Sequence, residues 1–109
     1  LTIANLDLPP LEDNNNKLAY HFFPVLINEK TPITRDQLLV ELNKDGIGSG
    51  VHYESIADHP YYQRSFGWKA EDTPLASKFG KSEISLPISP MITEENMEYI
   101  VDMVIKHTQ

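Results

Sequence analysis

The segment GIGSGVHYESIADHPYY, residues 46–62, places glycines, histidines, carboxylates and tyrosines close together in the chain. Side chains of these types could serve three kinds of site: a metal centre, a phosphate-binding loop, or the wall of a pocket that another part of the protein completes. Each kind of site needs its own spacing and its own order of helices and strands. The sequence therefore allows the three to be weighed against one another.

A metal centre would use His52 and Glu54, which lie two residues apart on one face of an extended segment, together with the distant His107. Two histidines and a carboxylate can form the facial triad of a non-haem iron site. However, such pairs often arise by chance, and a histidine in the last turn of a helix is explained by the helix dipole. We therefore rank a metal centre well below the pocket wall and expect no metal ligands here.

A phosphate-binding loop would use Gly46, Gly48 and Gly50. Loops that cradle phosphates follow a strand and open a helix, so that the amino end of the helix faces the anion. Here the glycines follow a helix and enter an extended segment, which is the inverse order. A helix stop followed by a bare backbone face explains them better. Ser49 and Ser55 have no arranged base that would favour a nucleophile.

The elements around this segment can be predicted from local signals. Residues 17–28 are apolar on both alternating faces, which is typical of a strand covered on two sides, with an edge or a bulge expected at Pro24. Thr34 begins a capping box at the start of a helix that Gly46 ends. The pattern of residues 47–53 predicts a second strand.

The predicted strand 47–53 has two different faces, because side chains alternate along a strand. One face is largely apolar, whereas the other carries only two glycines and the imidazole of His52. Bare backbone of this kind is expected where another group must approach closely. The strand therefore favours the third kind of site, a pocket wall.

Three further helices are predicted downstream of this wall. A short helix is expected to begin at Pro60 and a second one at Pro74, with Leu75 and Phe79 facing inward. Thr93 caps a third helix, which begins with acidic residues and carries an apolar stripe. This order of elements predicts an α+β fold, in which helices pack on one face of a small antiparallel or mixed sheet.

The composition bounds the class of protein. A chain of 109 residues is long enough for one domain, and it has no cysteine for a disulfide. Its formal net charge of −7 disfavours nucleic acid and anionic membrane surfaces as partners. Without a spanning apolar run or a signal-peptide pattern, we expect a cytoplasmic protein. Residues 1–16, which contain a Pro-Pro pair and an asparagine run, are expected to be a linker from a missing upstream domain.

These features occur together in one known pattern. The chain resembles the carboxy-terminal portion of the DegT/StrS family of pyridoxal-phosphate-dependent sugar aminotransferases. The resemblance covers nearly all of the chain, and it depends on an ordered set of residues and not on one motif. The set is Ala19, Tyr20, His21, Phe22, Arg35, Asp36, Gly46, Ile47, Gly48, Val51, His52, Tyr53, Pro60, Tyr62, Asp72, Pro74, Ala76, Ser85, Leu86, Pro87, Pro90, Met91 and Thr93.

The resemblance implies a fold, a reaction and a set of partners. Residues 17–109 would be the small carboxy-terminal α/β domain of a fold-type I aminotransferase, whose large domain binds pyridoxal phosphate. The parent enzyme would be a homodimer that moves an amino group from glutamate to the keto group of a nucleotide-linked sugar. His52, Tyr53 and Glu54 would contact the substrate, although many family members carry proline where this chain has Glu54 and its neighbours.

The chemistry of the cofactor limits what these residues could do alone. A pyridoxal enzyme needs a lysine for the Schiff base, an acidic partner for the pyridine nitrogen and a cradle for the phosphate. None of these is recognisable in the sequence, and in the family they belong to the large domain. We therefore expect the isolated chain to bind no cofactor, to hold no catalytic residue and to be inactive. The alternative is an independent ligand-binding or regulatory module with the same fold, because a fold alone does not fix a function.

Overall fold

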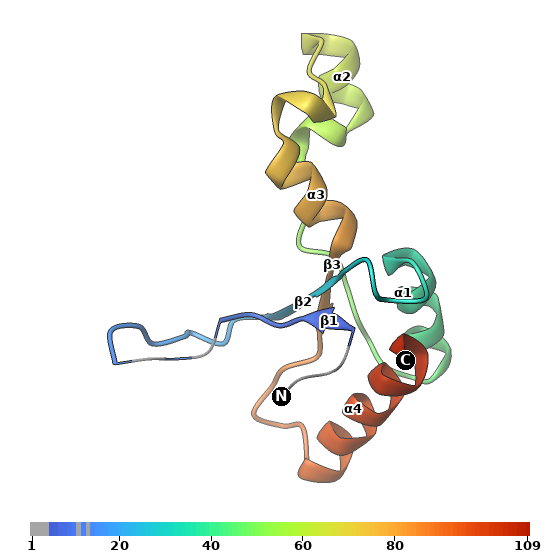
Figure 1. Cartoon of the computed structure of the whole chain (residues 1–109). Coiled ribbons are helices and arrows are strands. Elements are labelled where there is room, and N and C mark those ends of the chain that lie inside the picture. Colours follow the sequence, from blue (N-terminus) through green and yellow to red (C-terminus); the bar gives the residue numbers. More distant parts are fainter. Residues whose placement is uncertain (1–4, 11, 13) are drawn as a thin grey trace.

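Figure 1 shows the computed structural model of the chain, which describes residues 5–10, 12 and 14–109. Within these residues the chain forms three strands and four α-helices: β1 (Leu6–Asp7), β2 (Phe23–Ile27), α1 (Arg35–Lys44), α2 (Pro60–Phe66), α3 (Pro74–Ser82), β3 (Glu83–Leu86) and α4 (Glu94–Thr108). Short 3₁₀ turns, Ile56–Asp58 and Ala70–Asp72, precede α2 and α3. The predicted α+β class is confirmed, and the sheet is antiparallel in the order β1-β2-β3.

The central strand of the sheet is β2, which is shorter than the strand expected over residues 17–28. Of the edge or bulge expected at Pro24, the structure has the edge and not the bulge: Pro24 lies opposite Ser85 within a regular antiparallel ladder, and β1 does not extend to it on the other side. The sheet tolerates this proline because β1 pairs only with Leu26 and Ile27. Pro24 therefore has no strand on its other side, and its missing N–H leaves no ladder bond unmade there.

The expected linker, residues 1–16, includes strand β1. Its Leu6 is only 7% exposed and belongs to the hydrophobic core. The side chain of Asn5 donates a hydrogen bond of 2.6 Å to the carbonyl oxygen of Thr108, so this part of the chain is also tied to the end of α4. Residues 1–4, 11 and 13 lie outside the described residues. The boundary between linker and domain stays a prediction.

The hydrophobic core lies between the sheet and the two helices α1 and α4. Helix α1 packs beside α4 and against β3, and the figure shows both helices on the same side of the molecule (Figure 1). Side chains from all three strands and both helices meet there and are removed from water, which is the main force that holds such a layer together. The buried cluster consists of Leu6, Val25, Leu38, Leu42, Ile47, Ile84 and Val104.

Both ends of α1 follow the predicted local signals. At its start the side chain of Thr34 accepts a hydrogen bond from the backbone of Gln37, and the Gln37 side chain accepts one from the backbone of Thr34, which confirms the capping box. At its end Gly46 has a φ of 78°, a conformation that glycine adopts without strain. The backbone of Ile47 then donates to the carbonyl of Leu42 at 2.8 Å, as in a Schellman motif. This turn directs the chain into the candidate site.

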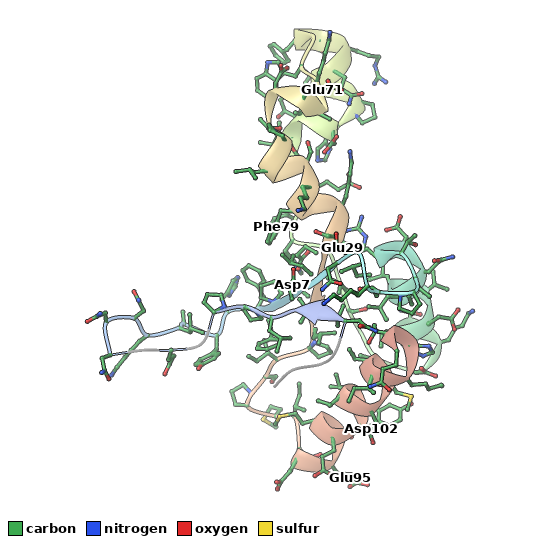
Figure 2. The ribbon with its side chains drawn as sticks, in the orientation of Figure 1. Asp7, Glu29, Glu71, Phe79, Glu95 and Asp102 are labelled. Carbon is green, nitrogen blue, oxygen red and sulfur yellow. The ribbon has the colours of Figure 1, made fainter. Side chains whose placement is uncertain are left out.

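The helices α2 and α3 form an arm that projects away from the sheet (Figure 1). The expectation that Leu75 and Phe79 face inward is wrong: they are 82% and 39% exposed, and Phe79 lies near the base of the arm, far from Glu71 at its tip (Figure 2). The buried residues of α3 are instead Ser77 and Gly80. Among the described residues no second layer covers the arm, so the buried face of α3 is the one whose small residues permit close contact.

Helix α4 confirms the predicted cap and charge pattern. The hydroxyl of Thr93 accepts a hydrogen bond from the backbone of Asn96, the first turn is acidic, and the last turn is basic. Of its apolar stripe, Val104 is fully buried, whereas Met97 is 55% exposed and lines a groove of about 270 Å³ beside the end of β3. Among the described residues, no helix is both long enough and apolar enough to cross a membrane.

Candidate functional site

The candidate site lies on the segment between α1 and the 3₁₀ turn at residues 56–58. The expected strand over residues 47–53 is wrong in part: these residues form no regular strand, and the segment joins the sheet through a single bridge at Gly50. In that bridge Gly50 and Ser85 exchange two backbone hydrogen bonds, of 3.2 and 2.8 Å. Only Gly50 of this segment pairs with β3, because the residues that follow Gly50 leave the strand toward α3 and the arm. We call residues 48–55 the site segment.

His52 is held to β3 by its backbone and by its ring. The backbone N–H donates to Oε2 of Glu83 at 2.7 Å, and Nδ1 lies 2.9 Å from the hydroxyl of Ser85. That hydroxyl in turn donates to Oε1 of Glu83 at 2.5 Å. The ring also packs near the rings of Phe22 and Tyr53, with centroid distances of 5.8 and 4.9 Å. The imidazole is therefore fixed in place while part of it remains exposed.

Tyr53 and Glu54 present their side chains to the outside. Tyr53 is 75% exposed, and Glu54 is exposed as well. Their backbone is held from behind by α3, because a Cβ on Gly80 would lie 2.9 Å from the carbonyl oxygen of Tyr53 and the nitrogen of Ser55. This close approach fixes the backbone without covering the side chains. The three predicted contact residues are consecutive in the chain, and their backbone is supported by β3 and by α3.

The glycine face of the site segment is only partly open. A Cβ on Gly48 would meet nothing within 4 Å, which agrees with space for an approaching group. At Gly50 a Cβ would meet Cε1 of His52 at 3.2 Å, so the histidine ring itself fills that space. Between them, Ser49 Oγ is the one buried side-chain oxygen or nitrogen without a partner in the described part of the chain.

His107, the third ligand considered for a metal centre, has a different partner in this structure. Nε2 of His107 lies 2.6 Å from Oδ2 of Asp45, at the junction of α1 and α4, where it forms an ion pair when the imidazole is charged. His107 is therefore a helix-end residue with its own partner. Within residues 5–10, 12 and 14–109, no three histidine or carboxylate side chains gather in a way that could hold a metal ion.

Tyr61 and Tyr62, the two tyrosines that end the segment 46–62, lie on the arm. Tyr62 is half-buried and stacks on Trp68 with a centroid distance of 5.3 Å and an interplanar angle of 14°. Tyr61 is 60% exposed and meets Tyr62 edge to face. Neither ring reaches the site segment through any described contact. We therefore assign them to the packing of α2 and not to the candidate site.

Glu83 is the site residue that the sequence reasoning missed. It is fully buried, and it accepts hydrogen bonds from both His52 and Ser85. The local signal was weak: Glu83 precedes Ile84, Ser85 and Leu86, and residues 83 and 85 share one face of a strand. A buried carboxylate is rare unless it has partners, so such a residue indicates a polar network.

The lysines do not offer a cofactor site on their own. Every lysine of the chain is exposed, and several are engaged in surface pairs, such as Lys81 with Asp58 and Lys44 with Glu41. A Schiff-base lysine needs a sheltered position beside the cofactor, with an acid for the pyridine nitrogen and donors for the phosphate. The residues described here do not bring these groups together, so no catalytic step is assigned to such a cofactor within this chain.

Comparison with known proteins defines the class to which this fold and site belong. The model of the DegT/DnrJ/EryC1/StrS aminotransferase family matches residues 2–105. The chain therefore belongs to the DegT/DnrJ/EryC1/StrS aminotransferase family, as the resemblance in the sequence suggested.

Individual relatives support the same assignment. The chain is 37% identical over 100 residues to the uncharacterized protein MJ1066 of Methanocaldococcus jannaschii, covering 91% of this chain and 26% of that protein. It is 33% identical over 100 residues to the UDP-4-amino-4,6-dideoxy-N-acetyl-beta-L-altrosamine transaminase of Helicobacter pylori, covering 90% and 25%. The fold matches that of Streptococcus pneumoniae Spr1654 in its PLP form, with a TM-score of 0.83 at 22% identity over 94% of this chain and 26% of that chain. The chain spans about a quarter of the length of the curated relatives that it matches.

Proposed function

We propose that the chain is the carboxy-terminal small domain of a pyridoxal-phosphate-dependent aminotransferase, which transfers an amino group from glutamate to the keto group of a nucleotide-linked sugar. Residues 17–109 form the small domain, residues 1–16 link it to a large domain, and the parent enzyme is a cytoplasmic homodimer. Family membership supports the reaction class. The relative named as a transaminase of an amino-sugar nucleotide supports the substrate class.

The division of labour between two domains follows from what this chain has and lacks. It spans about a quarter of the length of its relatives, and each of its lysines is exposed, whereas a Schiff-base lysine needs a sheltered position. Pyridoxal phosphate, when bound to the large domain, supplies the electron sink for amino transfer. The contribution that we assign to the small domain is to bind the sugar, to orient it and to exclude water.

The single observation that carries the proposal is the construction of the site segment. His52 is clamped to β3, and Tyr53 and Glu54 are exposed on a backbone that Gly80 supports at close contact. Binding groups on a rigid, supported backbone are typical of a preorganised ligand site. A segment that served only as a connection would need neither the buried carboxylate nor the close helix contact.

Each side chain suits a different part of a sugar nucleotide. The carboxylate of Glu54 repels phosphate, so we assign it to the sugar hydroxyls, from which it accepts hydrogen bonds. The ring of Tyr53 offers an apolar face and a polar tip, which suits packing on a sugar ring. His52 offers its ring nitrogen Nε2. The diphosphate belongs to a more basic surface, because this chain carries a net charge of −7.

The experiment measures steady-state amination by the full-length protein, with glutamate and a panel of keto sugar nucleotides, followed by mass spectrometry of the amino sugar. Separate variants His52→Gln, Tyr53→Phe and Glu54→Gln each remove one polar contact. We expect kcat/KM for the keto sugar to fall about 10- to 100-fold in at least two of them, since such contacts contribute roughly 1–3 kcal/mol. The matched control is His59→Gln, because His59 is an exposed histidine on the arm and its ring makes no described hydrogen bond.

Two results would contradict the proposal at different levels. If the wild-type protein aminates no keto sugar nucleotide, the assigned reaction is wrong. If it does so, but the three variants match His59→Gln in kcat/KM, the reaction stands and the assignment of the site segment is wrong.

A further inference from the structure

Behind the site segment lies a chain of three polar groups: the Glu83 carboxylate, the Ser85 hydroxyl and the His52 imidazole. We propose that Glu83 and Ser85 are positioning residues that fix the hydrogen of the neutral His52 ring on Nδ1, so that Nε2 accepts a hydrogen bond from a hydroxyl or N–H group of the sugar substrate. The identity of the ligand rests on the proposed function. The position of the hydrogen is a property of this chain and can be measured without the reaction.

Glu83 sets the direction of the hydrogen bonds among these three polar groups. Its side chain is fully buried, and its two oxygens have different donors: the His52 backbone N–H at 2.7 Å and the Ser85 hydroxyl at 2.5 Å. A carboxylate has acceptors only, and an O–H···O⁻ bond of this length is typical of a charge-assisted hydrogen bond. Arg35 donates to the main-chain oxygen of Glu83 at 3.1 Å, which holds the backbone of this residue in place. The single hydrogen of Ser85 is therefore directed to Glu83.

The tautomer of His52 follows from this direction. The Ser85 oxygen lies 2.9 Å from Nδ1, but its own hydrogen is already donated to Glu83. It can therefore only accept, and Nδ1 must carry a hydrogen. In the neutral imidazole one nitrogen is a donor and the other an acceptor, so Nε2 is the acceptor.

The acceptor on Nε2 is free to meet a ligand. No described residue forms a hydrogen bond with it, and it is not among the buried atoms without a partner, so it reaches solvent. The contacts with Phe22 and Tyr53 restrict rotation of the ring, and the backbone bond to Glu83 fixes its base. A ring of fixed orientation and fixed tautomer discriminates between a ligand that donates at this point and one that does not.

Replacing one oxygen of the Glu83 carboxylate by an NH₂ group should reverse the direction of the hydrogen bonds from residue 83 through Ser85 to His52. In Glu83→Gln the amide keeps the shape of the side chain but has one acceptor and one donor group. If its oxygen accepts from the His52 backbone, its NH₂ must donate to Ser85. The Ser85 hydrogen then turns to Nδ1 of His52, and the ring hydrogen moves to Nε2. The variant would change the outward-facing nitrogen from an acceptor to a donor.

The first measurement determines the tautomer in the full-length protein labelled with ¹⁵N at the histidine rings. Solid-state NMR distinguishes a protonated ring nitrogen from an unprotonated one, and the loss of signals in His52→Gln identifies the His52 ring. We expect a protonated Nδ1 in the neutral wild-type ring, a protonated Nε2 in Glu83→Gln, and the wild-type pattern in the control Glu98→Gln, which alters an exposed residue of α4. A wild-type ring with its hydrogen on Nε2, or an unchanged tautomer in Glu83→Gln, would overturn the proposal.

The second measurement connects the tautomer to the substrate and does not depend on the folding of Glu83→Gln. Ser85→Ala removes the hydroxyl that links Glu83 to His52, and Ser85→Thr restores a hydroxyl at this position. Ser82→Ala is the control, because the Ser82 hydroxyl bonds only to carbonyls of its own helix. We expect kcat/KM for the keto sugar to fall about 10-fold in Ser85→Ala and to recover in Ser85→Thr, with KM for glutamate unchanged. An equal loss for both substrates, or no loss, would overturn the positioning role. A wild-type protein with the expected tautomer but no amination would contradict the proposed function alone.

Discussion

At the scale of single residues, the site depends on two residues that touch no proposed ligand, Arg35 and Gly80. Arg35 is buried and donates hydrogen bonds to the carbonyl oxygens of Gly80 and Glu83, at 2.9 and 3.1 Å. It therefore joins the first turn of α1 to the place where α3 ends and β3 begins. Because buried carbonyl groups without partners are costly, this arginine fixes the two elements that hold the site segment.

Gly80 gives a direct test of the close contact between α3 and the site segment. In Gly80→Ala a new Cβ would lie 2.9 Å from two backbone atoms, so the segment must shift. Overpacking of this kind costs about 1–3 kcal/mol, which exceeds the gain of up to about 1 kcal/mol in helix propensity. We expect the free energy of unfolding in urea to fall by about 1–2 kcal/mol.

The matched control for this prediction is Gly48→Ala. The added Cβ meets nothing within 4 Å, and Gly48 has no left-handed conformation that an alanine would strain. We expect its free energy of unfolding to stay within about 0.5 kcal/mol of wild type. If Gly80→Ala were as stable as Gly48→Ala, the close packing described at the base of the arm would be wrong.

The residues of the site differ in how far the sequence could reveal them. His52, Tyr53 and Glu54 stand out locally, because they follow glycines in a segment with one bare face. Glu83 does not, because its partner His52 is 31 residues away in the chain, and only the pairing of Gly50 with Ser85 brings the two together. Polar networks between distant segments depend on tertiary structure, which no local pattern encodes.

At the scale of elements, α1 and α4 are joined at their carboxyl ends by Asp45. Its carboxylate lies 2.6 Å from Nε2 of His107 and 3.8 Å from Nζ of Lys106, and the Tyr99 hydroxyl donates to its carbonyl oxygen at 3.0 Å. The hydrogen bond from His107 holds the pKa of Asp45 below its usual value, and the charge of Lys106 adds to this effect. The two helix ends are thus tied together by a polar junction and not by apolar packing alone.

The lowered pKa of Asp45 predicts how this junction responds to acid. A carboxyl group whose pKa is lowered on folding stabilises the fold above its unfolded pKa of about 3.9, and that stabilisation is lost as pH falls through the lower folded value. Urea unfolding should therefore show wild type more stable than Asp45→Asn at about pH 5, with a smaller difference at about pH 3.

The control for the acid response is Asp102→Asn, which removes an exposed carboxylate of α4 that has no described ion pair (Figure 2). We expect it to alter stability little at either pH. A difference between wild type and Asp45→Asn that stayed constant from pH 5 to pH 3 would contradict the junction.

Helix ends were predictable because their signals are local. The Thr34 capping box, the Gly46 stop and the Thr93 cap each depend on residues within one turn, and the structure confirms all three. The predicted strand 47–53 was wrong in part because strands are completed by distant partners, and β3 offers it only one residue. The prediction that Leu75 and Phe79 of α3 face inward was wrong, because periodicity cannot tell whether another layer of the protein covers the helix.

At the scale of the whole molecule, the shape is more open than that of an independent domain. The radius of gyration is 15.5 Å, whereas a compact chain of this length is expected near 13 Å. The arm carries exposed Tyr61, Phe66 and Leu75, and a groove of about 270 Å³ with an almost wholly apolar lining lies between α4 and the end of β3. Large exposed apolar surfaces typically contact another domain or protein. The open shape and these apolar surfaces therefore support the proposal that this chain packs against another domain.

We propose that this chain supplies the substrate side of an aminotransferase while another domain holds the cofactor. The most direct test is to incubate the full-length protein and the isolated 109 residues with pyridoxal phosphate, to reduce both with borohydride, and to map the labelled lysine by mass spectrometry. We predict stoichiometric label on one lysine of the full-length protein outside these 109 residues, and no stoichiometric label on the isolated chain. A stoichiometric label on a lysine within the 109 residues would contradict the account.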